Sequence, residues 1–150
     1  MASTTFSGPV TSTNGFIGAL TGNIAGTGSI THTATAITAT ATLTAAQVAT
    51  GYIAVTSATA VALTLPTGTL LGAALGAVQG TVFDLYIDNT ASTSTGIVTM
   101  VVATNGILST AAADTPGSFG DLTVAVGATG IGRFTLMFSS ATAYVFTRTA

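Results

Sequence analysis

The sequence predicts an all-β protein: a β-sandwich or jelly-roll-like domain of seven or eight short strands, preceded by an extended N-terminal arm. Thr fills 33 of the 150 positions, and β-branched residues suit the pleated sheet. Several short runs alternate apolar and polar side chains, which is the period of a strand. Gly-, Asn- and Pro-containing segments separate these runs at the intervals typical of sandwiches and jelly rolls.

The first 30 residues differ in texture from the rest of the chain. Gly recurs at positions 8, 15, 18, 22, 26 and 28, and this spacing is incompatible with a stable helix. The apolar residues between these glycines are isolated. They are therefore better suited to insert singly into the surface of a partner than to form a buried core. We therefore divide the chain into an extended docking arm (residues 1–30) and a β-sandwich oligomerisation domain (residues 31–150). The alternative for the arm is a disordered tail.

The domain begins with an alternating Thr/Ala stretch over residues 29–43, which predicts a strand. Residues 44–50 suit one helical turn, with Thr44 as its N-cap and Gly51 as its stop. Residues 67–78 carry Leu and Ala at helical spacing but are interrupted by glycines, so they predict a short helix or an irregular crossover. The remaining expected strands cover residues 52–56, 61–65, 81–89, 96–103, 121–126, 131–139 and 143–149.

Residues 81–89 form the clearest strand pattern. Val82, Asp84, Tyr86 and Asp88 fall on one face of this strand and alternate with apolar residues on the other. The predicted core draws on the apolar faces of the later strands. Its members are Phe83, Leu85, Ile87, Val98, Leu122, Val124, Phe134, Leu136, Phe138, Val145 and Phe146.

Charge is almost absent from the chain. It has two Arg, four Asp, one His and no Lys, Glu, Cys or Trp, although about a quarter of an average sequence is charged. Net charge keeps proteins apart, and Lys commonly blunts edge strands. We therefore interpret the chain as one whose edges and faces are covered by neighbours, with compositional bias as the alternative.

The same composition argues against several classes of function. Two Arg cannot neutralise a run of phosphates, so we expect no nucleic-acid partner. Without Cys there is no disulfide, zinc–cysteine or thiol redox site. The longest apolar run, residues 70–78, is too short to span a membrane, and the first residues do not form a standard signal peptide.

No catalytic constellation stands out, and we expect neither an enzyme nor a cofactor. His32 lies in the Thr/Ala stretch with no carboxylate nearby in sequence. Asp84 and Asp88 share a strand face but stand roughly 13 Å apart, which is too far for a glycosidase pair. Calcium ligation there stays open, although structural aspartates are favoured and no metal site is assigned. Arg133 and Arg148 are each expected to pair with an Asp or an inter-subunit carbonyl and to set subunit register; Thr33 and Thr35 are further interface candidates.

Several segments resemble a known family. The opening stretch TFSGPVTSTNGFIG (residues 5–18) is similar to the N-terminus of tailed-phage head decoration and head fibre proteins. The segments LTAAQVATGYIAVT (43–56), LTLPT (63–67) and FDLYIDNT (83–90) resemble the compact β domain that such proteins share. The resemblance implies a trimeric cement protein on the outer capsid surface, with the major capsid protein as partner. By that analogy the capsid-docking residues are Phe6, Pro9, Val10, Phe16 and Ile17.

The sequence-based hypothesis is therefore a non-enzymatic virion protein that decorates and stabilises a phage capsid through its arm and a trimeric β domain. One alternative is a fibre-tip or receptor-binding protein whose loop over residues 114–120 binds a glycan. Another is a self-assembling extracellular filament or surface-layer subunit, in which the arm complements the sheet of the next subunit. Neither nucleic acid nor membrane is an expected partner.

Overall fold

A computed structural model describes residues 32–108 and 122–150. These parts of the chain are mostly β, with ten strands in two mixed sheets, two short α-helices and one 3₁₀ turn, η1 (Gly127–Thr129). The six-stranded sheet has the order β1 (Thr35–Ile37), β3 (Tyr52–Val55), β5 (Val82–Asp88), β9 (Ile131–Ser140), β10 (Ala143–Arg148) and β7 (Gly106–Leu108). The four-stranded sheet has the order β2 (Ala41–Thr42), β4 (Val61–Thr64), β6 (Val98–Val101) and β8 (Thr123–Val124).

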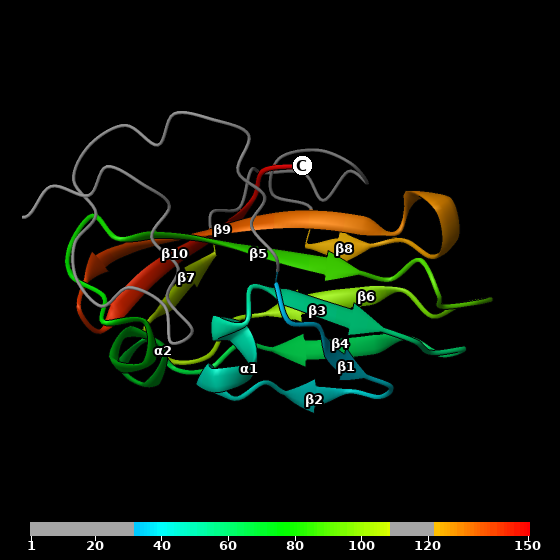
Figure 1. Cartoon of the computed structure of the whole chain (residues 1–150), viewed down its shortest axis with the longest axis horizontal. Helices are drawn as coiled ribbons and strands as arrows, with labels where there is room; N and C mark the ends of the chain where they lie inside the picture. The colour runs from blue at the N-terminus through cyan, green and yellow to red at the C-terminus, as the bar shows by residue number, and fades with distance from the viewer. Residues whose placement is uncertain (1–31, 109–121) are drawn as a thin grey trace, which may run out of the picture. The chain divides into compact units, whose positions relative to one another are not determined.

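The first six strands alternate between the two sheets (Figure 1). β1, β3 and β5 lie parallel in the larger sheet, and β2, β4 and β6 lie parallel in the smaller one. The chain therefore winds through three stacked arches, at residues 38–40, 56–60 and 89–97. Five of the eight pairings are parallel and three are antiparallel. A jelly roll consists of antiparallel strands, so that topology is not confirmed.

Hydrogen bonds join each arch to the next. The Ser57 amide donates to Ser92 Oγ at 2.9 Å, and Ser92 Oγ donates to the Val55 carbonyl at 3.3 Å. The Ala62 amide donates to Thr40 Oγ1 at 3.1 Å. Hydroxyl groups thus satisfy backbone groups that no strand ladder reaches.

The two helices lie side by side at the end of the sheets away from the arches (Figure 1). Helix α1 (Ala45–Ala49) has a capping box in which Thr44 Oγ1 accepts from the Gln47 amide, and Gln47 Oε1 accepts from the Thr44 amide. This confirms the predicted helical turn. Helix α2 (Gly68–Leu75) begins at Thr67 and ends at Gly76, whose φ of 59° is left-handed.

One hydrophobic core is shared by the inward faces of both sheets. Phe134 and Phe146 stack at its centre, with ring centroids 5.0 Å apart. Most predicted core residues are buried, and Phe83 and Leu122 pack against the core from its margin. The prediction that Val145 belongs to the core is wrong, because this residue pairs with Met137 on the outward face of the sheet and is only half-buried. The prediction missed eleven buried hydrophobic residues, namely Leu43, Val48, Ile53, Val55, Val61, Leu63, Leu65, Leu71, Ala77, Met100 and Tyr144.

The prediction of one continuous strand over residues 29–43 is also wrong. Within the described part of this stretch, residues 32–43, only Thr35–Ile37 and Ala41–Thr42 are strands, and they belong to different sheets because the chain bends between them. Residues 29–31 and 109–121 lie outside the described residues. The division at residue 30 therefore stays a prediction.

Candidate interaction sites

The outer face of the six-stranded sheet gathers residue types that are rare in this chain. Three of the four charged residues within the described parts lie there: Asp84 and Asp88 on β5, and Arg133 on β9. Tyr86 stands between them on β5, and Tyr52 lies opposite it on β3. We call these five side chains the polar face. Strand alternation places them outward because Leu85, Ile87 and Phe134 point into the core.

Asp84 and Arg133 form an ion pair across neighbouring strands. Arg133 donates from Nη2 to Asp84 Oδ2 at 2.6 Å, and Thr135 donates from Oγ1 to Asp84 Oδ1 at 2.7 Å. The Thr135 hydrogen bond, followed by those from Arg133, lowers the pKa of the Asp84 carboxyl below its usual value. The predicted pairing of Arg133 with an Asp is therefore present within the chain.

Asp88 is bonded to uncharged groups. Tyr52 donates its hydroxyl to Asp88 Oδ2 at 2.5 Å, and Thr90 donates its hydroxyl to Oδ1 at 2.6 Å. The hydrogen bond from Thr90, and then that from Tyr52, lowers the pKa of Asp88. The same hydrogen bond raises the pKa of the Tyr52 phenol. Asp88 therefore carries a negative charge held by neutral donors.

Tyr86 has a charged or ionisable neighbour on each side. The guanidinium carbon of Arg133 lies 6.0 Å from its ring centroid, and the ring of His32 lies 5.8 Å from it. His32 is held by a contact of 3.0 Å between its Nδ1 and the Thr50 carbonyl oxygen. Tyr and Arg are enriched in protein interfaces, whereas Asp is depleted there.

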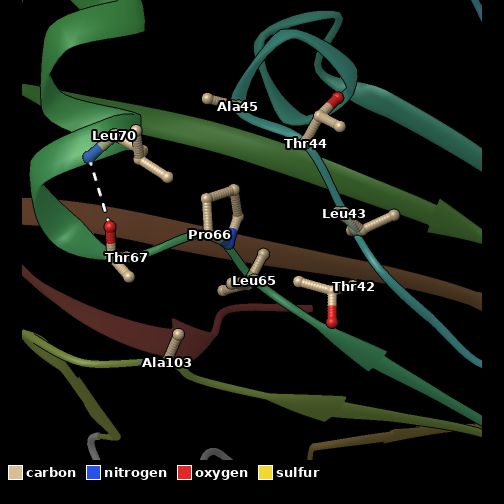
Figure 2. A pocket seen from close by; sticks show the side chains of 9 residues that line it. All are labelled: Thr42, Leu43, Thr44, Ala45, Leu65, Pro66, Thr67, Leu70 and Ala103. Atoms are coloured by element: carbon tan, nitrogen blue, oxygen red, sulfur yellow. Dashed lines mark hydrogen bonds between the residues drawn. The ribbon is translucent and has the colours of Figure 1, made fainter.

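A pocket of about 420 Å³ lies where α1 and α2 begin. It opens beyond the carboxyl ends of β2, β4 and β6, and Figure 2 shows the side chains around it. Its lining contains no charged residue and comprises Thr42, Leu43, Thr44, Ala45, Leu65, Pro66, Thr67, Leu70 and Ala103. Thr44 and Thr67 accept hydrogen bonds from amides of their own helices, so their hydroxyls serve as caps. The pocket suits an uncharged, apolar group.

The other predicted interface residues lie apart from the polar face. Thr33 is exposed just before β1, whereas Thr35 is half-buried with its Oγ1 3.3 Å from that of Thr50. Arg148 donates from Nη1 to the Thr123 carbonyl oxygen and lies over the Phe134 ring. Their predicted roles in oligomer contacts stay predictions.

The five predicted capsid-docking residues, Phe6, Pro9, Val10, Phe16 and Ile17, lie outside the described residues, as does the loop over residues 114–120. Within the described ranges, no three His, Asp, Glu or Cys side chains gather as a metal site. Across the same residues, no helix is both long and apolar enough to cross a membrane. The sequence prediction did not find the pocket, because its lining comes from segments that only the fold brings together.

No family model, no curated protein and no solved structure matches this chain.

Proposed function

We propose that the chain is a non-enzymatic structural protein of a virion, which decorates and stabilises the outer surface of a phage capsid. In this proposal residues 1–30 dock onto the major capsid protein. The β domain, a two-sheet sandwich, assembles with copies of itself, and the resemblance to decoration proteins favours a trimer. Several weak arm contacts would then combine into strong avidity.

The observation that carries this proposal is the distribution of charge. Residues 1–83 contain no Asp, Glu, Lys or Arg, and they include strands β1 and β2. Among the described residues, these two strands have no hydrogen-bonded neighbour on their outer side. Neither strand contains a Pro. Both strands are very short, with three and two residues, which limits pairing at these edges, but neither charge nor Pro protects them further against association with other chains. This uncharged part of the molecule suits a surface that is covered in its working state.

Mechanical reinforcement follows from that arrangement. Copies that bridge neighbouring capsid subunits bury additional surface, and expansion of the shell must break those contacts as well. An uncharged surface avoids the large desolvation cost of charged groups on burial, and its hydroxyls then need only hydrogen-bond partners in the contact.

Deletion of residues 2–20 tests the assignment of the arm. We expect the shortened protein to keep the β-rich circular dichroism spectrum and the oligomer mass of the full chain. It should lose binding to purified heads that lack this protein, measured by co-sedimentation. A full-length Phe6→Ser/Phe16→Ser variant separates the loss of these side chains from the loss of chain length. It should also bind the heads weakly. Undiminished decoration of heads by the shortened protein would refute the docking role.

A further inference from the structure

We infer that the outer face of the six-stranded sheet is a contact surface between two copies of this chain, related by a two-fold axis. The inference rests on the self-assembly in the proposed function but does not depend on capsid docking. It concerns β5 and β9, whose outward side chains oppose one another in four rows: Val82 with Met137, Asp84 with Thr135, Tyr86 with Arg133, and Asp88 with Ile131.

Apolar side chains flank the polar face at both ends. Val82 and Met137 are 58% and 52% exposed at one end, and Ile131 is 55% exposed at the other. Large apolar side chains exposed to this degree contribute to stability only when a partner covers them. Met, Tyr and Arg are also enriched in protein interfaces.

The pattern of rows is self-complementary. Consider a two-fold axis that lies in the plane of the contact, runs perpendicular to the strands and passes between the second and third rows. This axis places the first row of one copy against the fourth row of the other, and the second row against the third. Met137 then faces Ile131 of the partner copy, so apolar side chains meet. The row containing Arg133 faces the row containing Asp84, which places Arg133 opposite Thr135 and diagonally next to Asp84 of the partner copy, whereas Val82 faces Asp88. Repeated contacts of this kind are the property of an isologous interface.

The hydrogen bonds already present favour this contact. Both oxygens of Asp88 accept from Tyr52 and Thr90, so this carboxylate needs no donor from the partner. Arg133 uses one nitrogen for Asp84, and a guanidinium carries five N–H donors. Its charge can therefore serve Asp84 in both copies.

The face is somewhat smaller than a standard interface, so the two-fold contact is a modest one. Its six strands hold 33 residues, which at about 3.4 Å per residue and about 4.8 Å between strands give roughly 540 Å². A standard protein interface buries about 800 Å² on each partner. A two-fold contact yields even-numbered assemblies, so it gives a dimer, or a hexamer if another surface forms the trimer.

The test compares oligomer mass by sedimentation equilibrium for the full chain and three single variants. Met137→Asp and Ile131→Asp each add a negative charge to the face, twice in every two-fold contact. We expect the dissociation constant to rise at least about tenfold and the mass to fall by half. Ile97→Asp is the matched control: Ile97 is 45% exposed in the third arch, and its replacement should leave the mass unchanged. Unfolding curves of the variants verify that they fold.

Cross-linking provides a second measurement. The chain has no Cys, so a mixture of Met137→Cys and Ile131→Cys chains should form disulfide-linked pairs on oxidation, more than either variant with Ile97→Cys. An odd-numbered wild-type mass that Met137→Asp leaves unchanged overturns the inference, as does a monomer at every concentration. If the protein does not bind capsids but still forms an even-numbered oligomer that Met137→Asp dissociates, the proposed function fails and the two-fold contact is supported.

Discussion

Replacement of Asn89 by Ala tests whether one side chain holds the third arch in place. Asn89 is fully buried at the end of β5. Its Nδ2 donates to the carbonyl oxygens of Gly96 at 2.9 Å, Val124 at 3.1 Å and Ala125 at 2.8 Å. The amide thereby joins the arch after β5 to the segment that contains β8. The variant would leave these carbonyl oxygens, of which those of Gly96 and Val124 are buried, without this donor.

The expected cost follows from the hydrogen bonds that are lost. Each net bond contributes about 1 kcal/mol, and a buried group left without a partner costs about 1–3 kcal/mol. Asn89 Oδ1 has no hydrogen-bond partner among the described residues, and its removal offsets part of the loss. We therefore expect Asn89→Ala to lower the free energy of unfolding by about 2–3 kcal/mol. That is a large fraction of the ~5–15 kcal/mol typical of a domain.

Urea unfolding followed by circular dichroism measures this change, at one protein concentration because association also stabilises the fold. Thr99→Ala on the exposed face of β6 is the matched control and should cost much less. Asn89→Asp should be more destabilising at neutral pH, because its carboxylate would face three carbonyl oxygens. Burial would raise the pKa of that carboxyl, so the lost stability should return as the pH falls. A cost for Asn89→Ala no greater than that for Thr99→Ala would refute the reasoning.

Three further outcomes are expected. Gly72→Ala should destabilise the protein by about 1–3 kcal/mol despite its better helix propensity, because the new Cβ would collide with the backbone of the β9–β10 turn; urea unfolding measures this. Tyr144→Phe should cost about 1 kcal/mol through loss of the 3.0 Å bond to the Pro66 carbonyl. Burial raises the pKa of Tyr144 to about 12, so the wild type should lose stability from pH 10 to 12 and the variant should lose less. The lowered pKa of Asp84 predicts that stability falls with pH below its usual value of 3.8, and Asp84→Asn should flatten that acid limb in thermal melts.

Alternation of side chains was enough to predict single strands but not how they pair. β5 and β9 lie within a residue or two of their expected bounds because large apolar side chains alternate with polar ones. The Thr/Ala stretch over residues 29–43 lacks that contrast. Its alternation changes phase after Ile37, where the chain bends between β1 and β2, but that change alone did not identify a break between two strands. Parallel and antiparallel strands can share the same period, so the winding through two sheets was not predictable.

The polar face was predictable only in part. Strand period alone placed Asp84, Tyr86 and Asp88 on one side of β5. Their neighbour Arg133 is about 50 residues away in sequence, and only the antiparallel register of β5 and β9 brings it to Tyr86. The same reasoning applies to α2, where Gly72 and Gly76 were expected to weaken a helix. Gly76 ends the helix, and Gly68 and Gly72 have a packing role. They permit the close approach of the β9–β10 turn, which a side chain at either position would prevent.

The hydroxyl-rich composition has a structural use, and this bears on why the protein can dispense with charge. Ser and Thr side chains bond the backbone of neighbouring arches, as Thr40 does for Ala62 and Ser92 for Ser57. Such groups satisfy polar atoms without the desolvation cost that a buried charge carries. Compositional bias alone does not predict hydroxyls placed at these positions. Outward hydroxyls likewise avoid the desolvation cost of a charge, provided that a neighbour which covers them supplies hydrogen-bond partners. The proposed decoration of a capsid would use a surface of this kind.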